Sequence, residues 1–305
     1  MNSEDVVLSH DDINQIESES SVVDYYRLMK PTIILLVAVS FVAGFLIAPV
    51  DFNFITFFSS FIPVVFGSGA AGALNMWYDS DIDSIMSRTQ KRPIPSGKIN
   101  KQSAFEFGII TALISVTFIG IAVNILSAML LAFAIFFYSY IYTVLLKRNS
   151  IYNIEIGGLA GAIPPLIGWT ASMNSLSIEP FIILLIIFLW TPPHSWPLFM
   201  HLKNDYIKLG IPMTPIVKGE VYTKRLIIIY TILLITTSLL PFFLGFADIL
   251  YFIPCIAVNL ILLYKTFLFH YNKIKPIKLF LTSILYLFSI FGFLILDRIA
   301  FKLMT

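Results

Sequence analysis

Long apolar stretches alternate with short polar segments along most of the chain. A helix needs about 20 consecutive apolar residues to cross the hydrocarbon core of a bilayer. Double prolines interrupt two of the stretches, at Pro164-Pro165 and Pro192-Pro193, and such kinks are tolerated in membrane helices when neighbouring groups satisfy the freed carbonyls. The pattern predicts about nine transmembrane helices, near residues 31–50, 54–77, 104–123, 125–146, 154–171, 178–200, 226–246, 249–269 and 278–297.

The composition indicates the same fold class. Hydrophobic residues make up 58% of the 305 residues and charged residues 12%, whereas soluble domains carry roughly 25% charged residues. So few charges cannot cover the surface of a soluble globule, and so many apolar residues exclude a disordered chain. We therefore expect an all-α integral membrane protein. The single cysteine, Cys255, excludes an internal disulfide.

The first 23 residues differ from the rest, because they are rich in Ser, Asp and Glu and poor in large apolar groups. Such a segment cannot bury enough surface to fold alone, so residues 1–23 are predicted to form a disordered acidic tail. It lacks the basic start and apolar core of a secretory signal and the arginines of a mitochondrial transit peptide. Residues 24–305 are then one membrane-embedded domain, in a bacterial inner membrane.

Basic residues gather at alternate ends of the predicted helices. With a cytoplasmic N-terminus, 18 of the 20 Lys and Arg residues lie on the cytoplasmic side, and only Arg298 and Lys302 fall outside that set. This is the distribution that the positive-inside rule describes, so a multi-pass protein with its N-terminus in the cytoplasm is expected. The two long loops, 79–103 and 201–224, are then cytoplasmic, and long polar loops often carry function. The net charge of +2 gives no reason to expect a nucleic-acid partner.

Three oxygen-bearing side chains end the second apolar run. Asn75, Asp79 and Asp83 are spaced four residues apart, which places them in one stripe on a helix. They follow a stretch of small residues, 67–72, of the kind that lets membrane helices approach closely. Hard oxygen ligands suit Mg²⁺, which keeps several waters and is usually shared with substrate phosphates. The stripe predicts a magnesium site.

Four basic residues follow this stripe within one loop: Arg88, Lys91, Arg92 and Lys98. Guanidinium groups bind phosphate oxygens in bidentate fashion. Carboxylates, Mg²⁺ and basic groups together favour a diphosphate site. The alternative is that the acids are merely solvated and the bases only set topology. Asp81 is off the stripe and is expected to face water or the basic loop.

The second long loop repeats this chemistry. Asn204 and Asp205 offer oxygen ligands, and Lys203 and Lys208 flank them. The loop follows an apolar run on the same face of the membrane as the first loop, so the two can close on one diphosphate through two metal ions. A polar turn without such a role is an equally good interpretation of these residues alone.

The first motif, Asn75-x-x-x-Asp79-x-x-x-Asp83 followed by Arg92-Pro-x-Pro-Ser-Gly, resembles the intramembrane prenyltransferases of the UbiA superfamily. Other segments resemble one branch of it, the haem O synthases or protohaem IX farnesyltransferases. The resemblance runs from about residue 25 to 295. It rests on the segments Tyr142–Arg148, Gly157–Trp169, Leu189–Trp196 and Lys203–Met213. In this branch the second loop usually reads Lys-Asp-Asp-Tyr, and here Asn204 replaces one Asp, so its role as a metal ligand is open.

The resemblance implies a helical bundle around a central intramembrane cavity. Farnesyl diphosphate would be the donor and haem b the acceptor, with haem O as the product, for terminal oxidase biogenesis. Asp79, Asp83 and Asp205 would hold Mg²⁺, and Tyr142 and Lys147 would contact substrate. A haem A synthase or an oxidase assembly factor would be a possible partner.

One histidine lies deep in the sixth apolar run. His194 stands between Trp190 and Trp196, and histidine is a common axial ligand of haem iron. Taken alone, His194 is as well explained by a hydrogen bond to a neighbouring helix. The resemblance favours a haem-binding role, with the two flat tryptophan rings packed on the porphyrin.

Two other functions fit parts of the sequence. A related prenyltransferase with an aromatic quinone precursor as acceptor would share the first motif. A secondary transporter would carry polar residues near the bilayer midplane and internal repeats. Here the acids and bases cluster at one face of the membrane, which favours a diphosphate anchored at the rim.

Overall fold

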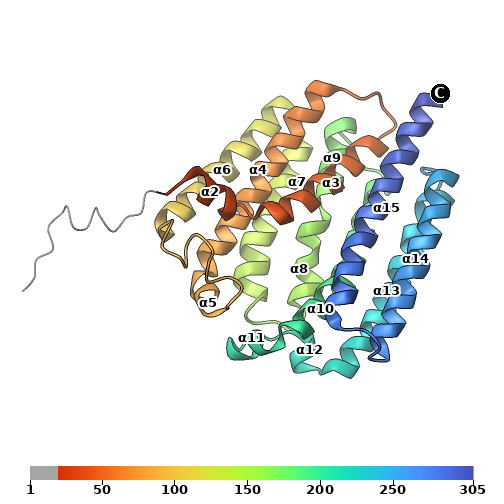
Figure 1. Cartoon of the computed structure of the whole chain (residues 1–305). Helices are drawn as coiled ribbons and strands as arrows, with labels where there is room; N and C mark the ends of the chain where they lie inside the picture. The colour runs from red at the N-terminus through yellow and green to blue at the C-terminus, as the bar shows by residue number, and fades with distance from the viewer. Residues whose placement is uncertain (1–19, 305) are drawn as a thin grey trace, which may run out of the picture.

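The computed structural model describes residues 20–304, and every regular element within that range is a helix. The helices pack side by side into one elongated bundle (Figure 1). In chain order they are α2 (Val22–Leu28), α3 (Pro31–Ile47), α4 (Phe54–Tyr78), α5 (Ser80–Ile85), α6 (Lys101–Ala122), α7 (Ile125–Phe136), the π-helix η1 (Phe137–Leu146), α8 (Asn153–Ala162), α9 (Pro164–Met173), α10 (Ile178–His201), α11 (Lys203–Lys208), α12 (Thr214–Val217), α13 (Glu220–Phe243), α14 (Ile249–His270) and α15 (Pro276–Met304).

The helices confirm the predicted all-α membrane architecture. Within residues 20–304, seven helices are long and apolar enough to span a bilayer, and α2 with α3, bent by 61°, make an eighth. The predicted run 154–171 is two consecutive helices, because α8 ends at Ala162 and α9 begins with Pro164, whose ring cannot continue the preceding helix. In contrast, α10 passes through Pro192 and Pro193 without a break. The predicted count of nine spans is approximate, because residues 20–304 contain seven or eight candidate spans.

The predicted tail comprises residues 1–23, and residues 1–19 of it lie outside the described residues. The described chain enters α2 through Ser21. The Ser21 hydroxyl accepts from the backbone N–H of Asp24, and the Asp24 carboxylate accepts from the backbone N–H of Ser21. This reciprocal pair satisfies two donors at the start of α2, so residues 22 and 23 already belong to the helical part of the protein.

Asparagines start three of the membrane helices. The side-chain oxygens of Asn53, Asn100 and Asn124 accept the backbone N–H three residues later, at 3.0, 2.7 and 2.8 Å. Each cap satisfies a donor that the first helical turn leaves free. The Asn124 amide also donates to the carbonyl of Thr170 at 2.8 Å, and this bond ties the start of α7 to α9.

Glycines allow α3 and α9 to meet closely. A Cβ atom added to Gly44 would lie 2.0 Å from the Pro165 carbonyl oxygen, and one added to Gly168 would lie 2.2 Å from the Phe41 carbonyl oxygen. Membrane helices associate through such close backbone approaches. The broken span α8–α9 is thereby held against α3 at the side of the bundle that contains the cavity described below.

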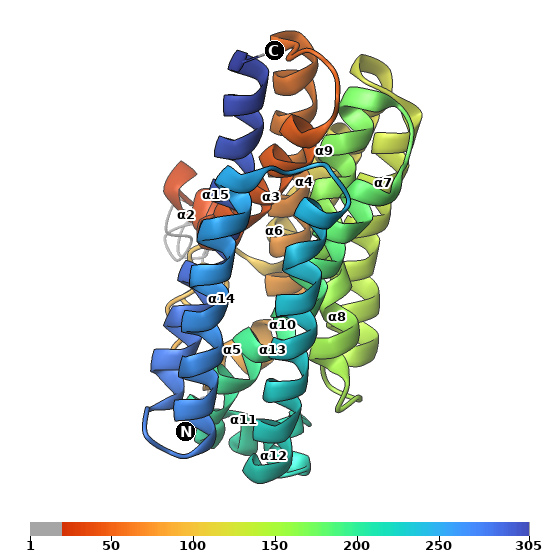
Figure 2. The same ribbon diagram turned by 90° about the vertical axis from the view of Figure 1, so that its right-hand side faces the viewer.

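The two ends of the bundle differ. The short helices α5, α11 and α12 all lie at one end (Figure 1). Figure 2 shows α13, α14 and α15 side by side along the bundle. The Asp297 carboxylate on α15 accepts the backbone N–H groups of Asp248 and Tyr251 at the start of α14, at 2.9 and 3.0 Å. Because α5, α11 and α12 belong to the two long polar loops, these loops gather at one end of the bundle, as the sequence predicts.

Candidate functional site: two buried carboxylates at an apolar cavity

A cavity of about 290 Å³ lies inside the bundle, between α3, α4, α7, η1, α8, α9 and α10. Its walls are mainly aliphatic and aromatic, and among the described residues that line it Lys30 is the only charged one. Tyr138 and Tyr142 of η1 face the same space. The central cavity predicted from the resemblance is therefore present. Its chemistry suits a long apolar group with one polar end.

The predicted stripe of oxygen ligands is preserved although the helix changes direction. α4 ends at Tyr78 and α5 begins at Ser80, but the backbone N–H of Asp79 still donates to the Asn75 carbonyl at 2.9 Å, and that of Asp83 to the Asp79 carbonyl at 2.8 Å. Asn75, Asp79 and Asp83 are all buried, at 3%, 0% and 2% exposure. This burial rules out the alternative that the stripe residues are simply solvated.

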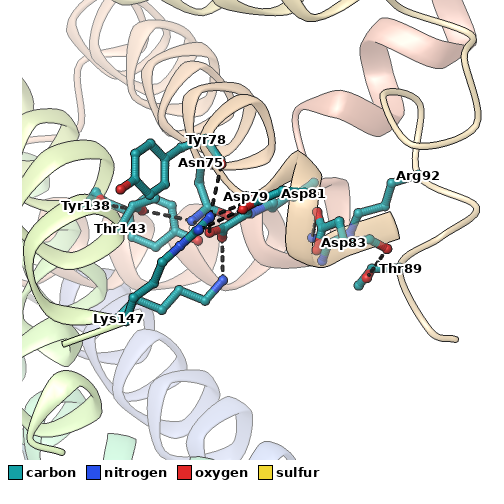
Figure 3. Close-up of polar contacts among 12 residues, drawn as sticks. Asn75, Tyr78, Asp79, Asp81, Asp83, Thr89, Arg92, Tyr138, Thr143 and Lys147 are labelled. Carbon is teal, nitrogen blue, oxygen red and sulfur yellow. Dashed lines mark hydrogen bonds and ion pairs between the residues drawn. The ribbon is translucent and has the colours of Figure 1, made fainter. Parts of the chain in front are cut away.

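Asp79 lies at the centre of a polar network (Figure 3). Its Oδ2 atom forms an ion pair with Lys147 at the end of η1 and accepts the Asn75 amide at 3.0 Å. Its Oδ1 atom is buried without a hydrogen bond, and the Arg148 guanidinium is 3.6 Å away. A buried carboxylate oxygen rarely lacks a partner in a native structure, so Oδ1 is a position where an added cation would be stabilised.

Lys30 connects this network to the cavity. It is buried, and its backbone is in the left-handed region with φ of 60°, between α2 and α3. Its ammonium group donates to Asn75 Oδ1, and the Asn75 amide donates to the Thr143 hydroxyl at 2.8 Å. Lys30 also lies over the Tyr138 ring, 5.7 Å from its centroid. A cation therefore sits where the cavity meets the carboxylates.

Asp83 has its own cation. Its Oδ2 atom accepts from Arg92 at 2.6 Å, and its backbone carbonyl accepts the Thr89 hydroxyl at 2.9 Å. Figure 3 shows Asp83 and Arg92 directed towards the loop, while Asp79 faces Lys147. The loop and the helix end thus each contribute one carboxylate–cation pair, and the buried charges are balanced.

Asp81 pairs with the end of η1 and not with the basic loop. Its side chain is 57% exposed and makes two hydrogen bonds with Arg148, at 2.7 and 2.8 Å. The Arg148 guanidinium lies 4.7 Å from the centroid of the Tyr78 ring. The hydrogen bond from Arg148 lowers the pKa of Asp81 below its ordinary value. Asp81 remains charged and helps to position Arg148 beside Asp79.

The second long loop approaches the first through α11. Tyr206 is buried, and burial raises the pKa of its hydroxyl, while the charges of Arg88 and Arg92 act in the opposite direction. Asp79 and Asp83 also act on Tyr206. In Figure 1, α11 lies at the same end of the bundle as α5, which follows the carboxylate end of α4. The two long loops therefore lie at one end, as the diphosphate hypothesis requires.

The predicted ligands of α11 differ in exposure. Asp205 is half-buried and forms no ion pair with any residue from 20 to 304. Asn204 and Lys208 are exposed, and Lys203 pairs with Glu220 at 3.1 Å. Asp205 is thus the member of this group whose carboxylate is available to a ligand.

The remaining predicted phosphate ligands lie in the first loop. Arg88 and Lys91 are exposed and make no ion pair in the described part of the chain. Lys98 pairs with Asp24 of α2 at 3.4 Å, and this contact holds the loop against α2. Arg88 and Lys91 are therefore available to an anion, whereas Arg92 and Lys98 have carboxylate partners, Asp83 and Asp24.

His194 is fixed by contacts on α10 and α15. Its ring is stacked between Trp190 and Phe280, with centroids 4.0 and 4.5 Å away. Its Nδ1 atom lies 2.8 Å from the Ser283 hydroxyl, which itself donates to the Phe280 carbonyl at 2.6 Å. The hydroxyl proton is used, so Nδ1 carries the proton and donates to Ser283. The Nε2 atom is left with a free lone pair, as an iron ligand requires.

The structure separates the two predicted tryptophans. Trp190 lines the cavity, and its indole N–H donates to the Ser283 carbonyl at 2.7 Å. Trp196 is fully buried and makes an edge contact with Tyr230 of α13, 5.6 Å away. Trp190 can pack against a ligand in the cavity, whereas Trp196 supports the packing of α10 on α13.

Lys30 and Thr143 were not among the predicted site residues. In the sequence, Lys30 is one of the basic residues that follow the positive-inside rule, although its position beside Pro31 indicates a helix boundary there. Thr143 lies one residue after the predicted Tyr142 and within hydrogen-bonding distance of Asn75. The sequence gives no direct signal for this contact, because the two residues are 68 positions apart.

The donor set fits a substrate-assisted magnesium site. Within residues 20–304, no three side chains of His, Cys, Asp or Glu come together as a complete metal site. Mg²⁺ commonly takes only one or two carboxylates and completes its shell with water and substrate phosphates. Asp79, whose Oδ1 accepts no hydrogen bond from the described residues, and Asp83 are the two carboxylates that would meet that need.

Comparisons with known proteins agree with this geometry. The model of the UbiA prenyltransferase family matches residues 36–292. The chain is 46% identical to a protoheme IX farnesyltransferase of Rhizobium etli over 94% of this chain and 93% of that protein. It is 47% identical to one of Neorickettsia sennetsu over 90% and 91%.

Solved structures share the fold at low identity. A structure described for digeranylgeranylglyceryl phosphate synthase has a TM-score of 0.77 at 20% identity, over 92% of this chain and 99% of that one. A UbiA homologue from Archaeoglobus fulgidus, bound to DMAPP and Mg²⁺, has a TM-score of 0.65 at 15% identity, over 89% and 99%.

Proposed function

This chain belongs to the UbiA prenyltransferase family, and on that premise we propose that it transfers a farnesyl group from farnesyl diphosphate to a vinyl group of haem b, with addition of water, to give haem O. Relatives that are 46–47% identical over at least nine-tenths of this chain are named protoheme IX farnesyltransferases. The acceptor in this proposal follows from those relatives, because the family alone does not specify it.

One structural observation carries the donor side of the proposal. The cavity is apolar along its walls and has one cation, Lys30, hydrogen-bonded to Asn75 beside the buried Asp79. An allylic diphosphate has the matching form, with an apolar chain and a highly charged head. The chain would occupy the cavity, and the head would meet the carboxylate end.

We propose that Mg²⁺ mediates this contact. Asp79 and Asp83 would hold the ion, with Asp205 approaching from α11. When bound, Mg²⁺ neutralises charge that develops on the departing diphosphate. Arg88 and Lys91 of the first loop and Lys208 of α11 are cations unpaired within the described residues that would meet the remaining phosphate oxygens, and Arg92 and Lys203 would join them by leaving Asp83 and Glu220.

The residues of this chain act by charge and by exclusion of water. The carbon–oxygen bond of the donor breaks, and the diphosphate leaves with the bonding electrons. Lys30, Lys147 and Arg92 are preorganised cations at the carboxylate end and stabilise that charge without reorganisation. The apolar walls shield the farnesyl cation from water until an acceptor arrives.

The acceptor then supplies electrons. The terminal carbon of a haem vinyl group forms a bond to C1 of the farnesyl cation, which leaves a cation on the carbon next to the porphyrin ring. Water adds there and loses one proton. Haem b, farnesyl diphosphate and water thus become haem O, diphosphate and a proton. Trp190, which lines the cavity, would contact the acceptor.

His194 would hold the haem iron. Its Nδ1 proton is committed to Ser283, and both ring faces are covered by Trp190 and Phe280. The free Nε2 atom is then the one group of the ring that a ligand can use. The protein is a multi-pass membrane protein, and we propose that it lies in the inner membrane with the loop end, which carries α5 and α11, in the cytoplasm.

The test is a product assay. Purified protein in detergent receives haem b, farnesyl diphosphate and Mg²⁺, and extracted haems are analysed by mass spectrometry. A haem heavier by one farnesyl group and one water supports the proposal. Transfer only to an aromatic quinone precursor would replace haem as the acceptor, and diphosphate left intact with every acceptor would argue against transferase activity.

A further inference from the structure

The wall that α8 contributes to the cavity consists largely of glycine. Gly157, Gly158 and Gly161 all line the cavity, together with Ile154 before them and Pro164 after them. Residues three and four apart share one face of a helix, so Ile154, Gly158 and Gly161 form one stripe. With 100° between successive residues, Gly161 lies at the centre of the face that α8 turns towards the cavity.

The three glycines differ in what a side chain would meet. A Cβ atom added to Gly157 would lie 2.3 Å from the Tyr142 ring, and one added to Gly158 would lie 2.9 Å from the Thr191 side chain. A Cβ atom added to Gly161 would have no heavy atom within 4 Å. Gly157 and Gly158 are thus needed for packing, whereas Gly161 is exposed, lines the cavity and has open space beside it.

Gly161 also lies deeper than the carboxylate end. Gly157 contacts Tyr142, and the next residue, Thr143, is hydrogen-bonded to Asn75 beside Asp79. Gly161 is one helical turn beyond Gly157, which is about 6 Å along the helix axis. A chain that entered the cavity from a head at Asp79 would therefore pass Gly161 after its first isoprene units.

We propose that Gly161 sets the length of the prenyl chain that the cavity accepts, an inference that rests on the proposed prenyl transfer. The cavity, at about 290 Å³, is at the small end of the roughly 300–1,000 Å³ typical of ligand pockets. A larger side chain at Gly161 takes space from the distal part of a three-unit farnesyl chain. A two-unit geranyl chain ends sooner and loses less contact.

The experiment compares binding of donor analogues. Wild type, Gly161→Ala and Gly161→Leu are titrated calorimetrically with the thiolodiphosphates of geranyl, farnesyl and geranylgeranyl chains, in the presence of Mg²⁺. Gly292→Leu is the matched control, because Gly292 is also a helical glycine with no heavy atom within 4 Å of an added Cβ and is absent from the cavity wall.

The affinity ratio of farnesyl to geranyl analogue is expected to fall about 10-fold or more in Gly161→Leu. It should fall less in Gly161→Ala and remain at the wild-type value in Gly292→Leu. An unchanged ratio in Gly161→Leu overturns the proposal. If Gly161→Leu binds none of the analogues, an unchanged ratio in Gly161→Ala overturns it instead.

This assay separates the inference from the proposed function, because it contains no haem. A shifted ratio in a protein that makes no haem O supports the role of Gly161 and contradicts only the acceptor. An unchanged ratio in variants of a protein that makes haem O contradicts only the role of Gly161.

Discussion

The ammonium group of Lys147 forms an ion pair with the carboxylate of Asp79, which is fully buried, although the two residues are 68 positions apart. The pair joins the end of η1 to the end of α4. An unpaired charge at such a position would be costly, so the ion pair offsets the cost of burying both groups. In the proposed mechanism, Lys147 balances Asp79 in the free protein, and it would face the diphosphate once Mg²⁺ balances that carboxylate.

Asp79→Asn tests the centre of the proposed metal site. The substitution keeps the shape of the side chain and removes the charge that would hold Mg²⁺, so farnesyl transfer is expected to fall by about 10²–10³-fold. The initial rate of haem O formation measures the effect. Thermal unfolding of the same preparation shows that the loss is chemical if the midpoint stays near the wild-type value.

Asp81→Asn is the matched control for that variant. Asp81 is two positions away, more than half exposed, and paired with Arg148, and exposed pairs contribute only about 0–1 kcal/mol to stability. Its rate is expected to stay within a few-fold of wild type. Equal losses in the two variants would show that the loop needs acidic residues generally and not a metal ligand at Asp79.

The sequence predicted the site as far as local spacing extends. Four-residue spacing placed Asn75, Asp79 and Asp83 on one stripe, and the backbone bonds preserve it. Helical spacing also separates the two tryptophans. Trp190 is four residues before His194 and shares its face, whereas Trp196 is two residues after it and points about 200° away. The prediction of Trp196 on the porphyrin ignored this periodicity, and in the structure Trp196 faces Tyr230.

Residue spacing cannot predict contacts between segments that are far apart in the sequence. Lys30 enters the site because the chain takes a left-handed turn before Pro31 and passes Asn75. Thr143 and Lys147 reach Asn75 and Asp79 because η1 packs along α4. The hydrophobic periodicity of the sequence predicts neither of these contacts. Spacing along the chain thus predicts which carboxylates share a stripe, and only the packing of the helices shows which cation meets which carboxylate.

Lys30→Met tests the cation at the cavity. The substitution keeps much of the side-chain length and removes a charge-assisted hydrogen bond, which contributes about 1.5–3 kcal/mol, so the affinity for farnesyl thiolodiphosphate is expected to fall about 10- to 100-fold. Calorimetric titration measures it. Lys224→Met is the control, since Lys224 is bonded to Asn272 and lies outside the cavity. Similar losses in both variants would mean that general positive charge, not Lys30, attracts the donor.

Removal of the metal is expected to weaken the binding of the diphosphate by the two loops. Lys147 and Arg92 already balance the two buried carboxylates, so Mg²⁺ alone is expected to raise the unfolding temperature only slightly. Mg²⁺ with farnesyl thiolodiphosphate should raise it clearly, because a ligand at 100 times its dissociation constant stabilises the native state by about 2.7 kcal/mol. A chelator should reverse the effect, and sodium chloride of equal ionic strength should not reproduce it. An equal rise with Mg²⁺ alone would indicate a metal site that is complete without substrate.

Ser283→Ala tests how His194 is held for haem iron. Ser283 accepts the Nδ1 proton of His194, so its loss frees the ring to rotate or to change tautomer. One neutral hydrogen bond contributes about 0.5–1.5 kcal/mol, and haem affinity is expected to fall about 2- to 10-fold, with a shift of the Soret band towards that of His194→Ala. Titration with haem, followed by absorption, measures both. Thr282→Ala is the control, because the Thr282 hydroxyl bonds only within its own helix, to the Lys278 carbonyl at 2.8 Å. A Ser283→Ala spectrum identical to that of wild type would mean either that Nε2 of His194 does not bind the iron or that it needs no support from Ser283. The spectrum of His194→Ala distinguishes these two explanations. If it too is identical to that of wild type, His194 does not bind the iron.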